Sequence, residues 1–539
     1  MASCPVHLEI QTHRANPVGV LRSSFRQEGK IKHTNHGRIT GLSLAQLKLI
    51  QAAFRGEVLP KDSPQAFRIL ASKEYGASYA LLHLAQELEL PQALYSRKEP
   101  WVQDCLAMIV GRVVYAGSKL ALSNQAKNTA LWELCGVEGW IDVEDHCYGP
   151  MDRLLARQKA IQRTLAAQHL QSGHLVLYDI TSTYLEGTYA QSDLVLFGYN
   201  RDGKNGHEQI VFGLLCNAQG CPVGVEVFAG NTQDAATVVD KIQELRQDYR
   251  LDKVTFVGDR GMITQAKARE LKKVEGLQTI TALTHRQIVE LLERQVIKAE
   301  LFDEKKIVEV IDPENPKQRY CLCRNPETAE REKTTRQRLL DLTQAGLSKI
   351  TGRKKKTAAE RLGAQVGKLL ARYKMGKFVE WKIQQGRLHW RWKDEAIAQE
   401  KLFDGCYIIS ADVSVEQMKE TEVVTAYKKL SLVEQAFRNL KTVALEIRPV
   451  YHKKDDRIRS HVFLCVLAYY VQWHLEQRLK PLFEEDGQGK YRQWTVENVL
   501  ERLKGIRQQR VSVGTVEFDQ VSQPDDEQQK ILELLKVKL

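Results

Sequence analysis

Two aspartates are candidates for chemistry because each follows a short apolar run that is typical of a β-strand. Asp179 ends the run HLVLYD, and Asp259 ends the run KVTFVGD. Ligands of α/β sheets bind outside the carboxyl ends of strands, where carboxylate oxygens can hold a hard cation. The alternative is that each aspartate only caps a turn or a helix. Because the two aspartates follow the first and fourth strands of one pattern, both interpretations stay open.

A third carboxylate lies on a predicted helix, in the segment TAYKKLSLVEQAFRNLK. Tyr427, Glu434 and Lys441 are spaced seven residues apart, and at about 100° per residue this spacing returns to nearly the same helix face. The apolar residues beside them can pack on a sheet, so that Glu434 would project from an anchored helix. An exposed Glu–Lys pair without a function explains the spacing equally well.

Three separated carboxylates on a basic chain indicate phosphoryl transfer on a nucleic acid. Mg²⁺, or Mn²⁺ as a substitute, prefers oxygen ligands, and two ions about 4 Å apart can serve the attacking and leaving oxygens of an in-line displacement. Lys441 could then pair with a phosphate. Tyr427 could donate to a phosphate or stack on a base.

The elements that must position these residues form an α/β pattern. The runs HLVLYDIT, QIVFGLLC, CPVGVEVF and KVTFVGD are short and β-rich, and QTITALT follows from Gln278. Helical patterns are predicted at 235–249 and 264–274. A meander of three strands followed by alternating helices and strands predicts a mixed α/β sheet.

Composition excludes several classes of protein. The 539 residues are 43% hydrophobic and carry 79 basic and 67 acidic side chains, a net charge of +12. This surplus favours a polyanionic partner, bound on a local stripe of the surface. No apolar run approaches the roughly 18 residues of a membrane span, and the N-terminus has no signal-peptide core. The ten cysteines contain no Cys-x-x-Cys pair, so we expect them to be reduced.

The flanking segments have other patterns. Residues 18–39 predict a basic hairpin, either simply solvated or a DNA-binding arm, and residues 44–170 predict mostly helices, as a bundle or with a helix-turn-helix. Residues 290–400 do not continue the alternation of strands and helices. They predict a long polar helical stretch and a strand pair that contains Trp381, Trp390 and Trp392. The nearby basic cluster of Arg353, Lys354, Lys355 and Lys356 is either a solvated surface or a contact with a nucleic-acid backbone.

These motifs resemble a known family, the DDE transposases of bacterial insertion sequences, in the insertion-sequence-four superfamily and its 1634-type subgroup. The resemblance is carried by Asp179 in LVLYDITSTY, by Asp259 in VTFVGDRGM, and by DGCYII leading to Tyr427, Glu434 and Lys441. The segments GNTQDA and RIRSHVFLCVLAYY and the N-terminal hairpin are also similar. The similarity is most specific in residues 174–285 and 402–471.

The resemblance implies an RNase H-like, mixed-sheet catalytic core that is interrupted by an insertion subdomain, after an N-terminal, mostly helical DNA-binding region. The implied segments are a basic hairpin arm (1–43), a helical DNA-end-binding region (44–172), a first core segment (173–289), the insertion (290–401), a second core segment (402–480) and a C-terminal appendage (481–539). Asp179, Asp259 and Glu434 would be the catalytic residues, and they would bind two Mg²⁺ ions.

The implied activity is cleavage of double-stranded DNA at terminal inverted repeats, followed by joining of the ends to target DNA by a homodimer. A bacterial cytoplasmic, nucleoid-associated location without a membrane partner is expected. The family's helix usually has Arg three residues after Tyr. Here that position is Leu430, so that Lys428, Lys429 or Arg438 would have to supply the cation. Arg260, next to Asp259, is a further candidate for DNA binding.

Three alternative functions follow from the same residues. A phosphatase of the haloacid-dehalogenase type needs Asp-x-Asp after its first strand, whereas this chain has Asp179-Ile180-Thr181. A stand-alone metal-dependent nuclease would use the same three carboxylates without joining DNA ends. A catalytically inactive, transposase-derived DNA-binding protein would be expected to have lost one of the three.

Overall fold

The computed structural model describes most of the chain. The described residues are 6–12, 16–27, 29–55, 67–171, 173–201, 203, 206–233, 248–249, 251, 253–260, 262, 276–302, 306–352, 358–443, 445, 447–448, 450–486, 493–513 and 516–539. The helix predicted at 264–274, nearly all of the one at 235–249, and the basic cluster Arg353, Lys354, Lys355 and Lys356 lie outside these residues. The chain forms two compact units, a central unit (Gln162–Arg438) and a terminal unit (Met1–Ile161 with Asn439–Leu539).

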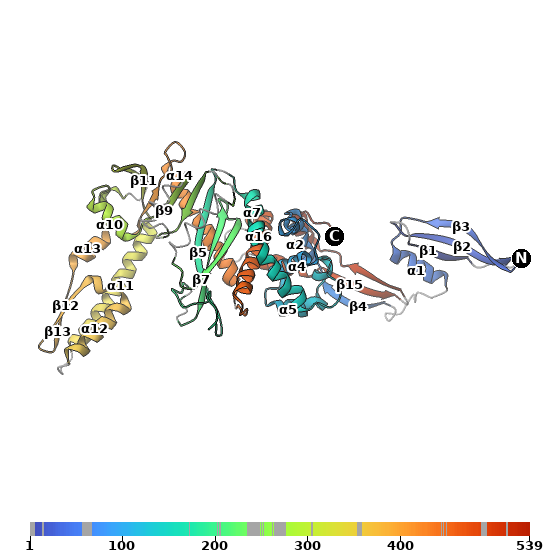
Figure 1. Cartoon of the computed structure of the whole chain (residues 1–539), viewed down its shortest axis with the longest axis horizontal. Coiled ribbons are helices and arrows are strands. Elements are labelled where there is room, and N and C mark those ends of the chain that lie inside the picture. Colours follow the sequence, from blue (N-terminus) through green and yellow to red (C-terminus); the bar gives the residue numbers. More distant parts are fainter. Residues whose placement is uncertain are drawn as a thin grey trace. The chain divides into compact units, whose positions relative to one another are not determined.

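The central unit contains an eight-stranded mixed sheet in the order β10-β11-β14-β9-β8-β5-β6-β7 (Figure 1). Its strands are β5 (Leu175–Tyr184), β6 (Gln209–Asn217), β7 (Pro222–Ala229), β8 (Val254–Gly258), β9 (Leu277–Ala282), β10 (Val308–Asp312), β11 (Asn315–Arg324) and β14 (Cys406–Ala411). β5, β8 and β9 pair in parallel, and the other pairs are antiparallel. The antiparallel β5–β7 meander beside the parallel β8 and β9 is consistent with the expected RNase H-like core.

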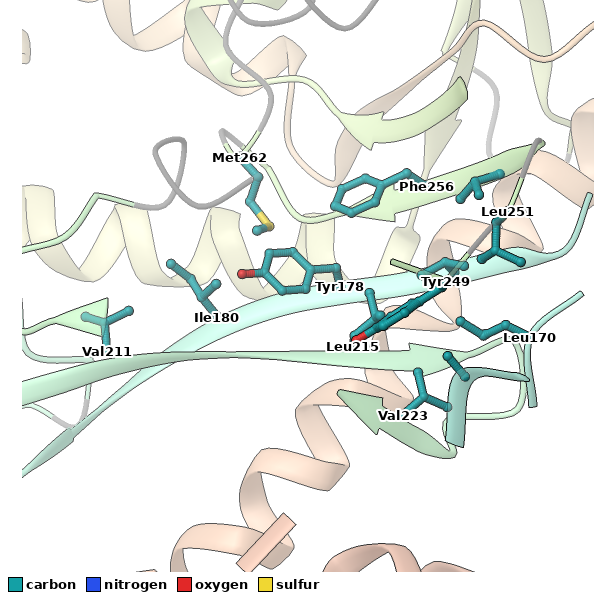
Figure 2. Packing of buried hydrophobic residues seen from close by; sticks show 13 residues of the cluster. Leu170, Tyr178, Ile180, Val211, Leu215, Val223, Tyr249, Leu251, Phe256 and Met262 are labelled. Carbon is teal, nitrogen blue, oxygen red and sulfur yellow. The ribbon is translucent and has the colours of Figure 1, made fainter. Parts of the chain in front are cut away.

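The core of this sheet explains the apolar runs in the sequence. Every residue of β6 and β8 is buried, as expected for strands that are covered on both faces. On one face, Tyr178 and Ile180 of β5 pack with Phe256 and Met262 in a buried cluster (Figure 2). Asp179 alternates with these residues, so its side chain lies on the other face of the sheet.

The insertion differs from the predicted one at its start. β10 and β11 fall within the predicted insertion, 290–401, yet they extend the central sheet because β11 pairs with β14 from Arg319 to Arg324. The elements between β11 and β14 are α11 (Pro326–Thr351), α12 (Ala359–Tyr373), β12 (Val379–Gln384), β13 (Arg387–Trp392) and α13 (Asp394–Leu402). They share a core of their own, into which Trp390 and Trp392 pack partly, whereas Trp381 is 38% exposed.

The terminal unit combines both ends of the chain. β1 (Val6–Gln11), β2 (Val18–Gln27) and β3 (Lys30–Ile39) form one sheet, so the predicted hairpin has a third strand. β4 (Phe67–Glu74) pairs with β15 (Arg507–Val513), which pairs with β16 (Val516–Val521). The helices are α1 (Leu44–Phe54), α2 (Gly76–Glu87), α3 (Leu90–Leu94), α4 (Pro100–Tyr115), α5 (Lys119–Asn124), α6 (Leu131–Leu134), α16 (Asp455–Glu485), α17 (Val496–Lys504) and α18 (Asp526–Leu535).

This arrangement differs from two of the predicted boundaries. The helix α16 packs on α4 and α2, and residues from Asn439 onward fall in the terminal unit by their contacts, whereas the predicted second core segment runs to residue 480. The segment 481–539, predicted as a C-terminal appendage, is joined to the N-terminal part of the chain, because its strand β15 shares a sheet with β4. The helix α7 (Gly149–His169) spans the boundary between the two units.

Among the described residues, no single helix is long and apolar enough to cross a membrane, although Pro100–Tyr115 and Lys119–Asn128, which meet at a sharp bend, pass that test as a pair on length and composition.

Candidate active site

Asp179 lies within β5 and does not end it, which corrects the prediction. The strand continues to Tyr184 because residues 180–184 stay paired with β6. The parallel pairing with β8, in contrast, ends at the register pair Tyr178–Gly258. Asp179 is therefore the first residue of β5 that no longer pairs with β8. From this residue onward, the sheet is open on the β8 side of β5.

Asp259 follows β8 directly, as predicted. Because Tyr178 is level with Gly258, Asp259 lies beside Asp179 across the two strands. Its backbone carbonyl accepts hydrogen bonds from the Thr281 hydroxyl and the Met262 amide, at 3.2 Å each. The Met262 side chain is buried beneath this turn against the sheet (Figure 2). The turn is thus held from both sides while the Asp259 side chain stays exposed.

Glu434 is presented by α15 (Leu430–Arg438), which packs on β5. Leu430, Val433, Ala436 and Phe437 form the buried stripe of this helix, and the ring of Phe437 meets that of Phe212 at 5.6 Å, edge to face. Phe212 pairs with Thr181, which lies on the same face of β5 as Asp179. Glu434, exposed next to Val433, is therefore carried on the face of the sheet where Asp179 projects.

The single helix predicted for Tyr427, Glu434 and Lys441 is wrong. Tyr427 is in α14 (Glu420–Lys428), a turn at Lys429 separates α14 from α15, and Lys441 is in a π-helical segment, Asn439–Val443. Lys441 is only 9% exposed and belongs to the terminal unit. The structure thus does not show the stripe of three polar residues that the spacing predicted.

Tyr427 nevertheless contacts the site. Its hydroxyl donates a hydrogen bond to Asp259 Oδ1 at 3.1 Å. Burial, and then the negative charges of Asp259 and Glu434, raise the pKa of Tyr427. The phenol therefore stays protonated and fixes the orientation of the Asp259 carboxylate.

The three carboxylates act on one another electrostatically. Burial raises the pKa of Asp179 to about 7, and the charges of Asp259 and Glu434 add to this increase. The Ile180 amide, which donates to Asp179 Oδ1 at 2.8 Å, and the Arg201 side chain oppose it. The effect of these two charges on Asp179 places all three carboxylates within electrostatic range of one another.

This donor set suits a divalent cation. All three side chains offer hard oxygen ligands, two of them are exposed, and their mutual repulsion is the kind that a cation relieves. Neither cysteine nor histidine contributes to the set, so a hard ion such as Mg²⁺ or Mn²⁺ fits better than a soft one.

Arg201 is a site residue that the sequence analysis missed. It lies in the connection between β5 and β6, where its amide donates to Ser182 Oγ at 3.1 Å, and its charge favours the ionised form of Asp179. The buried Gln209 side chain holds the same connection by donating to the carbonyls of Tyr199 (3.1 Å) and Gly230 (2.7 Å).

A groove of about 880 Å³ within the central unit reaches the neighbourhood of Asp259, because Arg260 and Tyr427 line it. Arg260, Tyr427 and Lys428 line it on the side of the site. Its lining includes six Lys and Arg side chains, Arg260, Arg331, Arg336, Lys374, Lys377 and Lys428, against three carboxylates, Glu332, Glu400 and Asp404. Two of the cations pair within the groove, because Arg336 binds Asp404 and Lys377 binds Glu400. The groove therefore has a net positive lining that begins beside the carboxylates.

The other predicted DNA-binding residues have different surroundings. Arg438 is exposed at the end of α15, four residues after Glu434. Leu430, at the position where the resembled family has Arg, is 6% exposed and belongs to the apolar stripe of α15. Of the cations suggested in its place, Lys428 lines the groove.

Comparison with known proteins gives a family match. A family model described as "Transposase DDE domain" matches residues 175–471, more than half of the chain, and the matched range contains Asp179, Asp259 and Glu434. No curated protein matches the chain.

Proposed function

The chain belongs to the family of transposases with a DDE domain, and from this premise we propose that it cuts DNA at the terminal inverted repeats of an insertion sequence and joins the ends to target DNA. We further propose the insertion-sequence-four superfamily and its 1634-type subgroup. The observation that carries the mechanism is the convergence of Asp179, Asp259 and Glu434 from distant parts of the sequence, with Asp259 and Glu434 both raising the pKa of Asp179.

These three residues would hold the divalent ions that DDE transposases generally use, proposed here as two Mg²⁺ ions. Such ions supply Lewis acidity toward phosphate oxygens and lower the pKa of a bound water or hydroxyl. The protein's own contribution is positional. β5 and β8 fix two carboxylates side by side, α15 adds the third, and Tyr427 orients Asp259 through its hydrogen bond.

The groove beside the site would accommodate a DNA strand. Its net positive lining suits a phosphate backbone, and Arg260 and Lys428 lie where that strand would approach the carboxylates. Arg438 and Arg201 are further candidates for phosphate contacts. A role for Lys441 or for the cluster Arg353–Lys356 remains a proposal from the sequence.

Two alternatives receive less support. A transposase-derived protein without activity has no need of three converging carboxylates with an exposed approach. A stand-alone nuclease would share the site, but it would release cut ends and not join them. Joining is therefore the product that separates transposase from nuclease.

The test is a cleavage and joining assay on DNA that carries the ends of the chain's own element. We expect Mg²⁺-dependent cutting and joined products, and a loss of at least about 10³-fold in both for Asp179→Asn, Asp259→Asn and Glu434→Gln, because each removes a charged metal ligand. Binding to the same DNA should persist. Glu330→Gln, at an exposed carboxylate of α11, is the matched control and should cut normally. Normal cutting by one of the three site variants would remove that residue from the site.

A further inference from the structure

A second positively charged cavity lies within the terminal unit, outside the candidate active site. Its volume is about 300 Å³. The α4–α5 connection, Tyr148 and the chain from Arg448 to His461 supply its lining, which includes Arg112, Lys119, Arg448 and two histidines. None of the lining residues is an aspartate or a glutamate.

Lys119 is the central cation of this cavity. Its residue is 6% exposed, and its ammonium makes a hydrogen bond of 2.6 Å with His461 Nδ1. Within the described part of the chain, no carboxylate pairs with Lys119. Removing an ammonium from water without an anionic partner destabilises the folded protein. A buried charge that destabilises the fold in this way is typical of a residue with a role in binding.

His461 positions Lys119 without neutralising it. An ammonium can only donate, so Nδ1 of His461 must be the acceptor. The proton of the neutral ring is then on Nε2, which donates to the Ile447 carbonyl at 2.9 Å. With this residue only 4% exposed, burial and the charge of Lys119 lower the pKa of His461. The histidine is therefore a neutral support, and the positive charge stays on Lys119.

The electrostatics of the neighbouring groups indicate an excess of positive charge. Burial, and then the charge of Arg112, lower the pKa of Lys119 to about 8. Burial, and then Lys119 and Arg457, lower the pKa of His452 to about 4. Two acidic groups of this region, Glu144 and Asp152, pair with Arg457 at 3.4 and 3.7 Å. A bound anion would reverse both shifts, because it favours the charged forms of these side chains.

An aromatic side chain adds a second feature to the cavity. Tyr451, one of its lining residues, is 66% exposed. Next to it in sequence, His452 is held edge to face by Tyr148 at 5.5 Å. Cations in a cavity and an accessible aromatic ring are the two elements with which proteins bind a nucleic-acid strand, through its phosphates and its bases.

We propose that this cavity binds a phosphate group of a DNA strand, with Lys119, Arg112 and Arg448 as its cations and Tyr451 available to stack on an adjacent base. The inference rests on the proposed function for its DNA. Free inorganic phosphate offers the same chemistry, so the test has two arms. The variants are Lys119→Met and Arg448→Gln. The control is Lys127→Met, at an exposed lysine that is not among the lining residues.

The first arm measures thermal unfolding with and without inorganic phosphate. Phosphate should raise the midpoint of the wild type and of Lys127→Met, since a ligand that binds only the folded state stabilises it, and the increase should be lost in Lys119→Met and Arg448→Gln. Without phosphate, Lys119→Met should unfold at or above the wild-type temperature because it removes a buried charge. This separates lost binding from lost folding.

The second arm measures the affinity for DNA without divalent ions over a series of salt concentrations. Each cavity variant should weaken binding about tenfold and reduce the slope of log affinity against log salt by about one, as for one lost phosphate contact. Loss in the first arm alone would overturn DNA as the source of the phosphate, and loss in neither arm would overturn the site. Both arms are independent of cleavage, so a failure of the proposed catalytic function would be seen separately.

Discussion

At the residue scale, the candidate site depends on how one carboxylate is held. Asp259 is exposed, and a free carboxylate on a turn would rotate. The Tyr427 hydroxyl occupies one of its two oxygens at 3.1 Å, which leaves the other directed for a ligand. This contact joins α14 to the turn after β8, two segments that are 168 residues apart.

Removal of that hydroxyl gives a prediction. Tyr427→Phe should lower the rate of DNA cleavage about tenfold, because a hydrogen bond to a charged group is worth about 1.5–3 kcal/mol and only a fraction of it is needed for orientation. The affinity for DNA without metal should change little. Single-turnover cleavage at several Mg²⁺ concentrations is the measurement.

The control for this variant is Tyr373→Phe, which changes a tyrosine that lines the same groove. The control should cleave at the wild-type rate. If Tyr427→Phe also cleaves at that rate, its hydroxyl does not orient the carboxylate, and Tyr427 would be left with a role in DNA contact alone.

Sequence reasoning could propose Asp179, Asp259, Glu434 and Tyr427 as candidates, because each has a local signal such as the end of an apolar run or a helical spacing. Arg201 had no such signal. Its position depends on the backbone contact with Ser182 and on the anchoring by Gln209, and both are tertiary contacts.

At the element scale, the sequence predicted the strands of the central sheet, but it did not predict where β5 ends. Residues 180–184 contain four hydroxyl side chains and only one aliphatic one, yet they stay in the strand because β6 pairs with them. The turn at Lys429 was not predicted from the sequence either. Neither glycine nor proline marks it, and the apolar residues continue across it.

The close packing of β5 on β6 requires a glycine. Gly213 pairs with Ile180, and a Cβ at Gly213 would lie 2.2 Å from the Tyr178 hydroxyl oxygen. Tyr178 is fully buried and immediately precedes Asp179. Any side chain at position 213 must therefore displace the Tyr178 ring and, with it, the strand that carries the catalytic candidate.

We therefore predict that Gly213→Ala destabilises the protein by about 1–3 kcal/mol, the usual cost of an overpacked core, and that it slows cleavage as well. Urea unfolding of the purified variants measures the first effect. Gly367→Ala is the matched control. Gly367 is an exposed position of α12 where an added Cβ meets nothing within 4 Å, so this change should stabilise by up to about 1 kcal/mol. Equal stability of Gly213→Ala and the wild type would contradict the packing argument.

At the scale of the whole molecule, the two compact units divide the chain differently from the six segments that the sequence predicted. The reason is that the decisive contacts are distant in sequence. β4 pairs with β15 from Phe67–Val513 to Glu74–Arg507, and α4 packs on α16. Composition and periodicity predict single helices and strands. They do not predict that β4 pairs with β15, because neither segment's sequence contains a signal for its distant partner.

The chain has a net charge of +12, and in the described structure basic side chains gather at two places. One is the groove that Arg260 and Tyr427 line in the central unit, and the other is the cavity around Lys119 in the terminal unit. Each contains more cations than acidic groups. A DNA substrate would account for both, which is why the central claim is tested on DNA.

The most direct measurement of that claim is a change of metal preference at one ligand. We would compare DNA cleavage by the wild type and by Asp259→Cys in Mg²⁺ and in Mn²⁺. Mg²⁺ binds oxygen and rejects sulfur, whereas Mn²⁺ accepts a thiolate more readily. We predict that the wild type cuts with both ions, that Asp259→Cys loses at least about 10³-fold in Mg²⁺, and that Mn²⁺ restores much of the loss. Cutting by Asp259→Cys in Mg²⁺ at the wild-type rate, or cutting by the wild type after all metal has been chelated, would contradict the account.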